Sequence, residues 1–215
     1  MPPAVRDAFL ARARQQPISR KQVVVAEGSQ GRDVYLVLSG RLLFSLVSPQ
    51  GREVILSDMG PGEMFGELSA IDGQPRSTNV TAIEDSRLAH LTGPEFTQLL
   101  GEVPEAGLWV AQQLAQRVRN LTDRAFELAT LPVASRVQAE LLRLALEVAE
   151  PGADSADIRP MPTHAELAAR IGTSREAVSR ELGLLGQDGL LQQRGRQLHI
   201  ASLSALRNQY ERMLR

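Results

Sequence analysis

The spacing of apolar residues changes once along the chain, and this change limits the possible folds more than any other feature. From about Gln22 to Leu91, short runs rich in β-branched and aliphatic residues alternate with turns that carry glycine. Such spacing is typical of an antiparallel β-barrel or sandwich. After Leu91, apolar residues recur mainly at helical spacing. We therefore expect an α+β protein with a β-rich part first and helices after it.

The boundaries of the expected elements follow from turn and capping signals. A short arginine-rich helix is expected over residues 4–16. Strands are expected over residues 23–26, 34–38, 42–47, 53–56, 77–82 and 86–91, with Gly51 at a hairpin tip. Thr92 and Glu95 have the spacing of a capping box and predict a helix start.

The longest periodic segment runs from about Glu105 to Thr130 and predicts a helix with a narrow apolar seam. Its apolar residues alternate at spacings of three and four over about two and a half heptads. The seam consists of Ala111, Leu114, Val118, Leu121, Ala125 and Leu128. Because charged residues such as Arg117 and Arg124 flank the seam, we favour a parallel dimer interface. The alternative is a helix that packs on its own domain.

Leu131-Pro132 interrupts this helix and predicts a hinge. We expect a β-roll domain over residues 1–104, the long helix and hinge over 105–131, and a second domain over 132–215. Within the second domain we expect helices over 133–149 and 202–215 and a loop over 150–162. A short β segment is expected over 190–200.

The segment from Thr163 to Leu182 has the order of signals of a helix-turn-helix. Thr163 and Glu166 form a capping-box spacing, Gly172 suits the helix end, and Thr173 or Ser174 caps a second helix. Recognition helices of this kind enter the major groove with their N-terminal residues, and Arg suits guanine. A hairpin follows, and its tip suits a wing on the DNA backbone. The predicted DNA-binding residues are Thr173, Ser174, Arg175, Glu176, Ser179, Arg180, Arg194 and Arg196. The alternative is an ordinary helical hairpin with solvated charges.

A second group of candidate binding residues lies in two neighbouring segments, Gly60–Ala70 and Gly73–Val80. Glycines let a backbone approach a ligand, and successive amides can bind an anion. Arg76 suits a phosphate, Ser77 adds a donor, and Glu67 suits a ribose hydroxyl. Taken alone, composition favours a plain salt bridge between Glu67 and Arg76 across two strands over a ligand site.

These motifs together resemble the CRP/FNR family of bacterial transcription regulators, in its cyclic-nucleotide-binding branch. The resemblance covers about Gln22 to Ile200 and is carried by Phe65-Gly66-Glu67-Leu68, Pro75-Arg76-Ser77-Thr78 and the block from Ser174 to Arg180. It implies a cyclic-nucleotide-binding β-roll, a long dimerisation helix and a winged helix-turn-helix. It also implies that a cyclic phosphate contacts Gly66, Arg76 and Ser77 and that Glu67 holds the ribose 2′-hydroxyl. The nucleotide-binding residues expected on this basis are Gly66, Glu67, Leu68, Ser69, Arg76, Ser77, Thr78, Leu121 and Thr122.

The sequence departs from the family at the base-binding pair. In the cyclic AMP receptor, a Thr-Ser pair on the long helix meets the purine, and the corresponding positions here are Leu121 and Thr122. This departure weakens the preference for adenine, so cyclic GMP, or no nucleotide at all, stays an alternative. Thr122 is either a base contact from one of the two subunits or a solvated helix residue.

Composition excludes several other functions. The 215 residues contain no cysteine, which rules out disulfides, iron–sulfur clusters and thiolate haem. The three histidines are scattered, so we expect no metal site. We see neither an apolar run long enough to span a membrane nor a signal peptide, so we expect a cytoplasmic protein. The net charge of −1 means that DNA binding depends on where the arginines lie and on dimerisation.

The sequence thus predicts a homodimeric, DNA-binding transcription regulator, not an enzyme, that is controlled by a cyclic nucleotide. Cyclic AMP is the preferred ligand, and the alternative is the same regulator responding to cyclic GMP or needing no nucleotide. Its expected partners are a pseudo-palindromic operator, a second copy of itself and RNA polymerase, for which residues 152–157 are a candidate contact. The rival from another class is a nucleotide-sensing subunit that regulates an enzyme through protein contacts.

Overall fold

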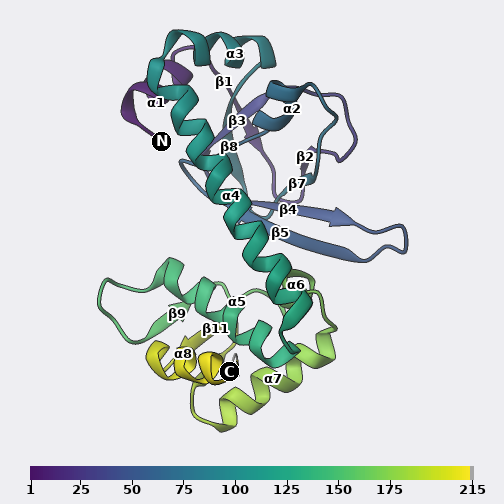
Figure 1. Cartoon of the computed structure of the whole chain (residues 1–215), viewed down its shortest axis with the longest axis vertical. Coiled ribbons are helices and arrows are strands. Elements are labelled where there is room, and N and C mark those ends of the chain that lie inside the picture. Colours follow the sequence, from purple (N-terminus) through teal and green to yellow (C-terminus); the bar gives the residue numbers. More distant parts are fainter. Residues whose placement is uncertain (214–215) are drawn as a thin grey trace. The chain divides into compact units, whose positions relative to one another are not determined.

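The computed structural model describes residues 1–213 and divides into two compact units. The first unit is Met1–Arg119 and the second is Asn120–Arg215. Helix α4 (Pro104–Thr130) contributes residues to both units (Figure 1). No helix within the described residues is both long and apolar enough to cross a membrane.

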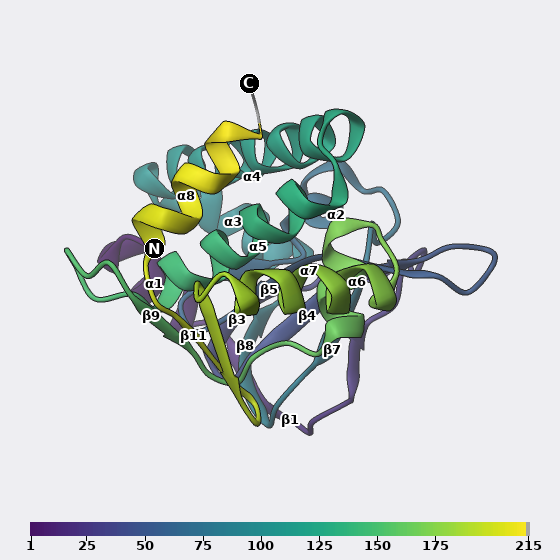
Figure 2. The same ribbon diagram turned by 90° about the horizontal axis from the view of Figure 1, so that it is seen from below.

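The first unit is built on two four-stranded antiparallel sheets. Their strand orders are β1-β8-β3-β6 and β2-β7-β4-β5. The strands are β1 (Arg14–Ile18), β2 (Val23–Val25), β3 (Val34–Ser39), β4 (Leu42–Val47), β5 (Glu53–Met59), β6 (Met64–Phe65), β7 (Asn79–Ala82) and β8 (Ser86–Leu91). The β4–β5 hairpin extends away from the body of this unit in two perpendicular views (Figures 1 and 2). Gly51 turns this hairpin with a φ of +79°, as the sequence predicts.

Helices close the ends of the β-roll. They are α1 (Pro3–Leu10), α2 (Glu67–Asp72), α3 (Gly93–Glu102) and the first part of α4. The Thr92 side chain accepts from the backbone N–H of Glu95, and the Glu95 carboxylate accepts from that of Thr92, so the predicted capping box is present. Trp109 of α4 packs in the same apolar cluster as Phe9 and Phe96. The first turns of α4 are therefore part of the core of this unit.

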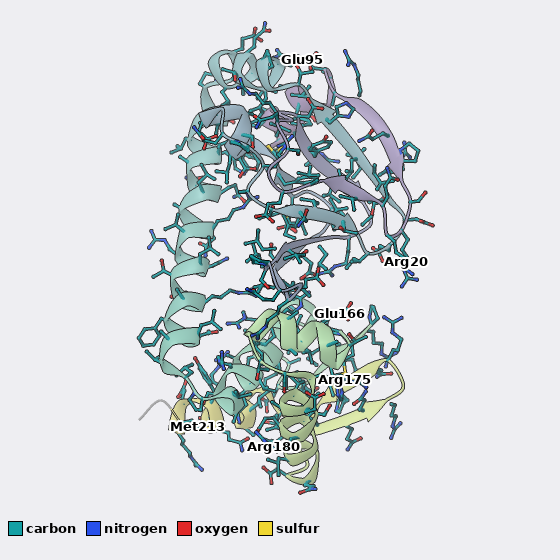
Figure 3. The ribbon with its side chains drawn as sticks, turned by 90° about the vertical axis from the view of Figure 1, so that its right-hand side faces the viewer. Arg20, Glu95, Glu166, Arg175, Arg180 and Met213 are labelled. Atoms are coloured by element: carbon teal, nitrogen blue, oxygen red, sulfur yellow. The ribbon has the colours of Figure 1, made fainter. Side chains whose placement is uncertain are left out.

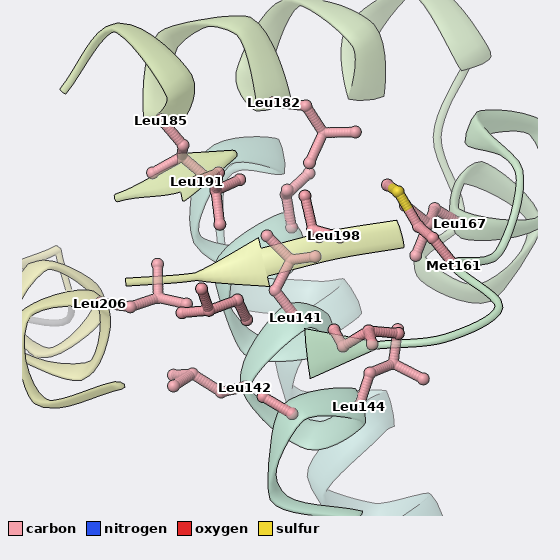
Figure 4. Packing of buried hydrophobic residues seen from close by; sticks show 14 of the residues in the cluster. Leu141, Leu142, Leu144, Met161, Leu167, Leu182, Leu185, Leu191, Leu198 and Leu206 are labelled. Carbon is pink, nitrogen blue, oxygen red and sulfur yellow. The ribbon is translucent and has the colours of Figure 1, made fainter. Parts of the chain in front are cut away.

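The second unit packs helices around a three-stranded sheet of order β10-β11-β9. Its elements are α5 (Val133–Val148), β9 (Ala156–Ile158), α6 (His164–Ile171), α7 (Arg175–Gln187), β10 (Leu191–Arg194), β11 (Gln197–Ile200) and α8 (Leu203–Arg212). Figure 4 shows its core, in which leucines of α5, α7 and α8 meet those of the strands. The predicted wing is the β10–β11 hairpin, turned at Gly195 with a φ of +60°.

Several predicted boundaries are wrong, and the two largest differences arise where a strand forms in a weakly patterned segment. The helix expected over 4–16 ends at Leu10, since Arg14–Ile18 pairs with β8. The loop expected over 150–162 contains β9, which pairs with β11. The strand expected over 53–56 continues to Met59, and that expected over 77–82 begins at Asn79. Of the last predicted helix, positions 214–215 lie outside the described residues.

Candidate nucleotide site and DNA-binding surface

The predicted phosphate turn is the junction between β6 and α2. Gly66 is the N-cap of α2 and has a φ of +88°, which disfavours any residue with a side chain. A Cβ atom there would lie 2.5 Å from the carbonyl oxygen of Asp33 and 2.7 Å from Nη1 of Arg76. Only glycine therefore allows this close approach of the backbone to Arg76.

Arg76 is buried, with 5% of its surface exposed. Its Nη1 donates to the carbonyl oxygen of Gly66 at 3.0 Å, and its Nη2 donates to that of Asp33 at 2.7 Å. Burial lowers the pKa of Arg76, while Tyr35, Asp33 and Glu67 oppose that change. A guanidinium stays charged in proteins and carries five N–H donors. The side chain is thus a fixed buried cation with donors beyond its two carbonyl bonds.

Glu67 lies in the first turn of α2 and is 2% exposed. Its Oε1 accepts a hydrogen bond from Arg117 Nη1 at 2.5 Å, and Arg117 Nη2 donates to the carbonyl oxygen of Met64 at 2.5 Å. Its Oε2 is buried and has no hydrogen-bond partner among the described residues. A buried acceptor left unpaired costs free energy, so this oxygen suits a hydroxyl donor from a ligand.

The salt bridge between Glu67 and Arg76 across two strands is not what forms. Glu67 lies on α2, and its ion-pair partner is Arg117 of α4. The sequence predicted Arg117 only as a charged flank of the apolar seam. A single sequence shows that an arginine flanks the apolar seam, but it does not show which buried carboxylate this arginine contacts.

The other expected nucleotide-binding residues differ in how exposed they are and in the unit to which they belong. Ser69 is buried, Thr78 is half-buried, and Leu68 and Ser77 are exposed. Leu121 and Thr122 are exposed residues of α4 that belong to the second unit. The structure therefore brings Gly66, Glu67 and Arg76 together, whereas base contacts from Leu121 and Thr122 stay a prediction.

The helix-turn-helix has the predicted local geometry. Thr163 and Glu166 form a complete capping box at the start of α6. Gly172 ends α6 in the left-handed region with a φ of +65°. Ser174 then caps α7 by accepting from the backbone N–H of Ala177 at 3.3 Å. These caps fix where the predicted recognition helix begins.

The predicted DNA-binding side chains line the exposed part of α7 and the wing. Arg175, Glu176, Ser179 and Arg180 are exposed, and Figure 3 labels Arg175 and Arg180 along this helix. The Ser179 hydroxyl donates to the carbonyl oxygen of Arg175 at 3.0 Å and lies 2.7 Å from His164 Nδ1, a contact absent from the sequence analysis.

Charge is distributed unevenly over this surface. Arg180 pairs with Glu181 at 3.1 Å while its side chain stays 68% exposed. The pKa of Glu176 is lowered by hydrogen bonds from its own backbone N–H and from Ser174. Arg194 and Arg196 are exposed beside Gly195, and Thr173 is half-buried in the turn. The arginines suit cationic contacts to a polyanion, whereas the Glu176 carboxylate suits a donor on a base edge.

The predicted dimer seam is largely uncovered. Val118 is 62% exposed, Leu121 53% and Leu128 50%, and Ala111 and Ala125 are also exposed. Leu114 is half-buried and packs on the core of the first unit. The side of α4 that packs on that core instead carries Ala106, Trp109 and Val110. The seam is therefore available for a partner helix, and its role stays a prediction.

Comparison with known proteins assigns both units to families. Residues 15–102 match the cyclic nucleotide-binding domain, and residues 135–209 match the Crp-like helix-turn-helix domain. A CRP-like cAMP-activated global transcriptional regulator of Mycobacterium tuberculosis is 30% identical over 193 residues, 89% of this chain and 86% of the relative. A cyclic AMP receptor protein of Thermus thermophilus is 36% identical over 166 residues, 77% of this chain and 73% of the relative.

Solved structures of other proteins superpose on this fold over nearly the whole chain. The c-di-GMP-responsive global regulator of Xanthomonas campestris superposes with a TM-score of 0.78 at 27% identity and covers 92% of this chain and 98% of its own. A CRP/FNR-family transcriptional regulator of Thermus thermophilus gives a TM-score of 0.72 at 27% identity, with the same coverage. With both domains matched in order and a relative of this similarity over most of its length, the chain belongs to the CRP/FNR family of DNA-binding transcription regulators.

Proposed function

We propose that this protein is a cytoplasmic homodimer that binds a pseudo-palindromic operator under the control of cyclic AMP. The observation that carries the nucleotide part is the junction of β6 and α2. There the buried cation Arg76 lies against Gly66, and Glu67, which follows Gly66, keeps a buried oxygen with no partner in the described part of the chain. A cyclic phosphate and a ribose hydroxyl supply the acceptor and the donor that such a pair needs.

Cyclic AMP is preferred because several relatives are named as cAMP-activated regulators at 28–30% identity. Cyclic GMP is the second candidate, because Leu121 offers no hydrogen bond to an adenine and Ser77 and Thr78 are hydroxyl donors near the proposed phosphate position. The solved structure from Xanthomonas campestris is titled as responsive to c-di-GMP, so that nucleotide belongs in the same test.

The proposed mechanism couples the nucleotide to DNA through α4. The nucleotide binds next to Glu67, and Arg117 links that carboxylate to α4. Thr122 contacts the base, α4 pairs with the partner's α4 along the exposed seam, and the hinge near Pro132 repositions the recognition helices. A ligand shifts such an equilibrium only through different affinities for the two states. The bound dimer then acts on RNA polymerase through a surface that includes residues 152–157.

Calorimetry with cyclic AMP, cyclic GMP and c-di-GMP tests the ligand. The same protein is then titrated, with and without each nucleotide, into an operator duplex selected from random genomic fragments. We expect a single binding event for cyclic AMP and about a five- to 150-fold gain in operator affinity, the usual range of coupling between two sites.

Two variants make the test specific. Arg76→Ala removes the proposed phosphate contact, whereas Arg87→Ala removes an exposed arginine of β8 that bonds Gln15. If the unmodified protein gives no heat of binding with any of the three nucleotides, the proposed site is refuted. An operator affinity that stays constant at saturating nucleotide would refute the control.

A further inference from the structure

A second buried glutamate lies in the DNA-binding unit, on α5. Glu140 is 2% exposed and forms ion pairs with arginines from three different helices. Its partners are Arg124 of α4 at 3.6 Å, Arg143 of α5 at 2.9 Å and Arg170 of α6 at 3.5 Å. One carboxylate thus joins the last turns of α4 to the first helix of the helix-turn-helix.

The network has a second connection to α4. Both terminal nitrogens of Arg143 donate to the carboxylate of Glu127, at 2.8 and 3.1 Å. Burial lowers the pKa of Arg143, but its bonds with Glu127 and Glu140 outweigh this and raise it. Burial also lowers the pKa of Arg124, which Glu140 opposes. The charged forms are therefore held by one another within this cluster.

The turn between α6 and α7 is held from the same side. Arg136 of α5 donates through Nη1 to the carbonyl oxygen of Ile171, the last residue of α6, at 2.9 Å. A Cβ on Gly172 would lie 3.0 Å from Cδ2 of Leu128, so α4 also packs directly against this turn. Because α7 begins at Arg175, the position of the recognition helix depends on these contacts.

We propose that Glu140 is a positioning residue for DNA binding, which fixes the end of α4 against α6 and thereby sets the placement of the recognition helix. Apolar residues of similar volume often stabilise a core as well as a buried ion pair does. The ion pairs instead fix the orientation of the helices that carry them, because each guanidinium must meet the carboxylate in one geometry. If the nucleotide signal passes from α4 to the recognition helix through these contacts, that step rests on the proposed function.

The test compares Glu140→Gln, which keeps the shape and removes the charge, with Glu150→Gln at an exposed position just beyond α5. For each, cyclic AMP affinity is measured by calorimetry, and affinity for the operator and for a scrambled duplex is measured by anisotropy. We expect Glu140→Gln to leave cyclic AMP affinity unchanged and to lower the operator-to-scrambled ratio about five- to 150-fold. Glu150→Gln is expected to resemble the parent protein.

A rescue variant separates positioning from general destabilisation. Glu140→Gln leaves three arginines facing a neutral side chain, so the double variant Glu140→Gln/Arg170→Gln should recover part of the lost operator selectivity. If Glu140→Gln fails to fold, Arg124→Gln, at a less buried position, carries the same measurements.

The outcomes distinguish this proposal from the proposed function. An unchanged operator-to-scrambled ratio in Glu140→Gln, or an equal loss of affinity for both duplexes and for cyclic AMP, would overturn the positioning role. If the parent protein shows no response to nucleotide, the proposed function fails, while the operator-to-scrambled ratio still decides the role of Glu140.

Discussion

The two units treat their charged side chains in opposite ways. The first unit buries the groups proposed to meet its ligand, Glu67 and Arg76, and one oxygen of Glu67 has no partner among residues 1–213. The second unit buries Glu140 among three arginines and places Arg175 and Arg180 on its surface.

The difference follows from the size of what each unit binds. A small ligand can be enclosed, so its contacts can be dry and strong. A duplex cannot enter a protein, and its contacts must project into a groove or along a backbone. We therefore assign the Glu67 carboxylate, whose Oε2 has no partner among the described residues, to the proposed ligand site, and the Glu140 carboxylate, with three arginine partners, to a structural role.

The strongest test of this distinction is to remove each glutamate in turn. Glu140→Ala leaves the buried Arg170 and the partly exposed Arg124 and Arg143 without their shared carboxylate, and should lower the free energy of unfolding by about 3–5 kcal/mol. Glu67→Ala should cost less, because this carboxylate pairs with one arginine, Arg117, which is 33% exposed and can regain water, whereas Glu140 also pairs with Arg170 at 7%. Urea titration measures both changes. A larger loss of stability for Glu67→Ala would reverse the assignment of the two carboxylates.

Removing the buried cation of the first unit should abolish most nucleotide affinity. Arg76→Ala is expected to cost about 1.5–3 kcal/mol of binding, the range of hydrogen bonds to charged groups, or about 10- to 150-fold in Kd. Calorimetry measures the affinity, and Arg87→Ala serves as the control. Unchanged affinity would show that the phosphate lies elsewhere.

Removing a surface arginine of the second unit should change sequence preference and spare the fold. Arg180→Ala should cost about 1–3 kcal/mol at one base position of the operator. Competition with duplexes that carry single base changes measures it, and Arg207→Ala on α8 is the matched exposed control. An operator-to-scrambled ratio equal to that of the parent protein would refute base recognition by Arg180.

The free oxygen of Glu67 can be tested by a change in the ligand. Replacing cyclic AMP with its 2′-deoxy analogue should weaken binding by about 1.5 kcal/mol, the lower end of the range for a hydrogen bond to a charged group. In Glu67→Ala the two ligands should bind about equally, since the acceptor is gone. A deoxy effect that persists in Glu67→Ala would place the ribose hydroxyl against another group.

The smallest expected effect concerns pH and an exposed cap in the second unit. Hydrogen bonds from Ser202 and Ser204 hold the pKa of Asp154 below its ordinary value. Such a carboxylate stabilises the fold above its unfolded pKa, and the contribution disappears as the pH falls through the folded pKa. The Tm difference between the parent and Asp154→Asn should therefore shrink below about pH 4. A constant difference would contradict the charge-dependent role.

The sequence predicts most elements whose signals are local. The capping boxes at Thr92 and Thr163 and the glycine turns at Gly51 and Gly172 all lie where their patterns place them, because each depends on residues a few positions apart. Strands β1 and β9 were not predicted, since pairing with β8 and β11 stabilises segments with little apolar alternation of their own.

The candidate sites show the same limit. Gly66, Glu67 and Arg76 lie within eleven residues, and their motif predicted them as a group. Arg117 was missed because its partner Glu67 lies 50 residues away. The role of Glu140 was missed because its pair with Arg143 is local, whereas the contact that reaches α6, with Arg170, spans 30 residues. Their spacing resembles that of solvated helix charges, and only packing distinguishes the two.

The burial of Trp109 gives the two units different optical signals. It is the only tryptophan of the chain, is 8% exposed, and belongs to the core of the first unit. The second unit has one aromatic side chain in its last helix, Tyr210, and one in α4, Phe126. Tryptophan emission therefore reports unfolding of the first unit alone, while circular dichroism reports the helices of both. Comparing the two traces during denaturation measures directly whether the units unfold together or in sequence.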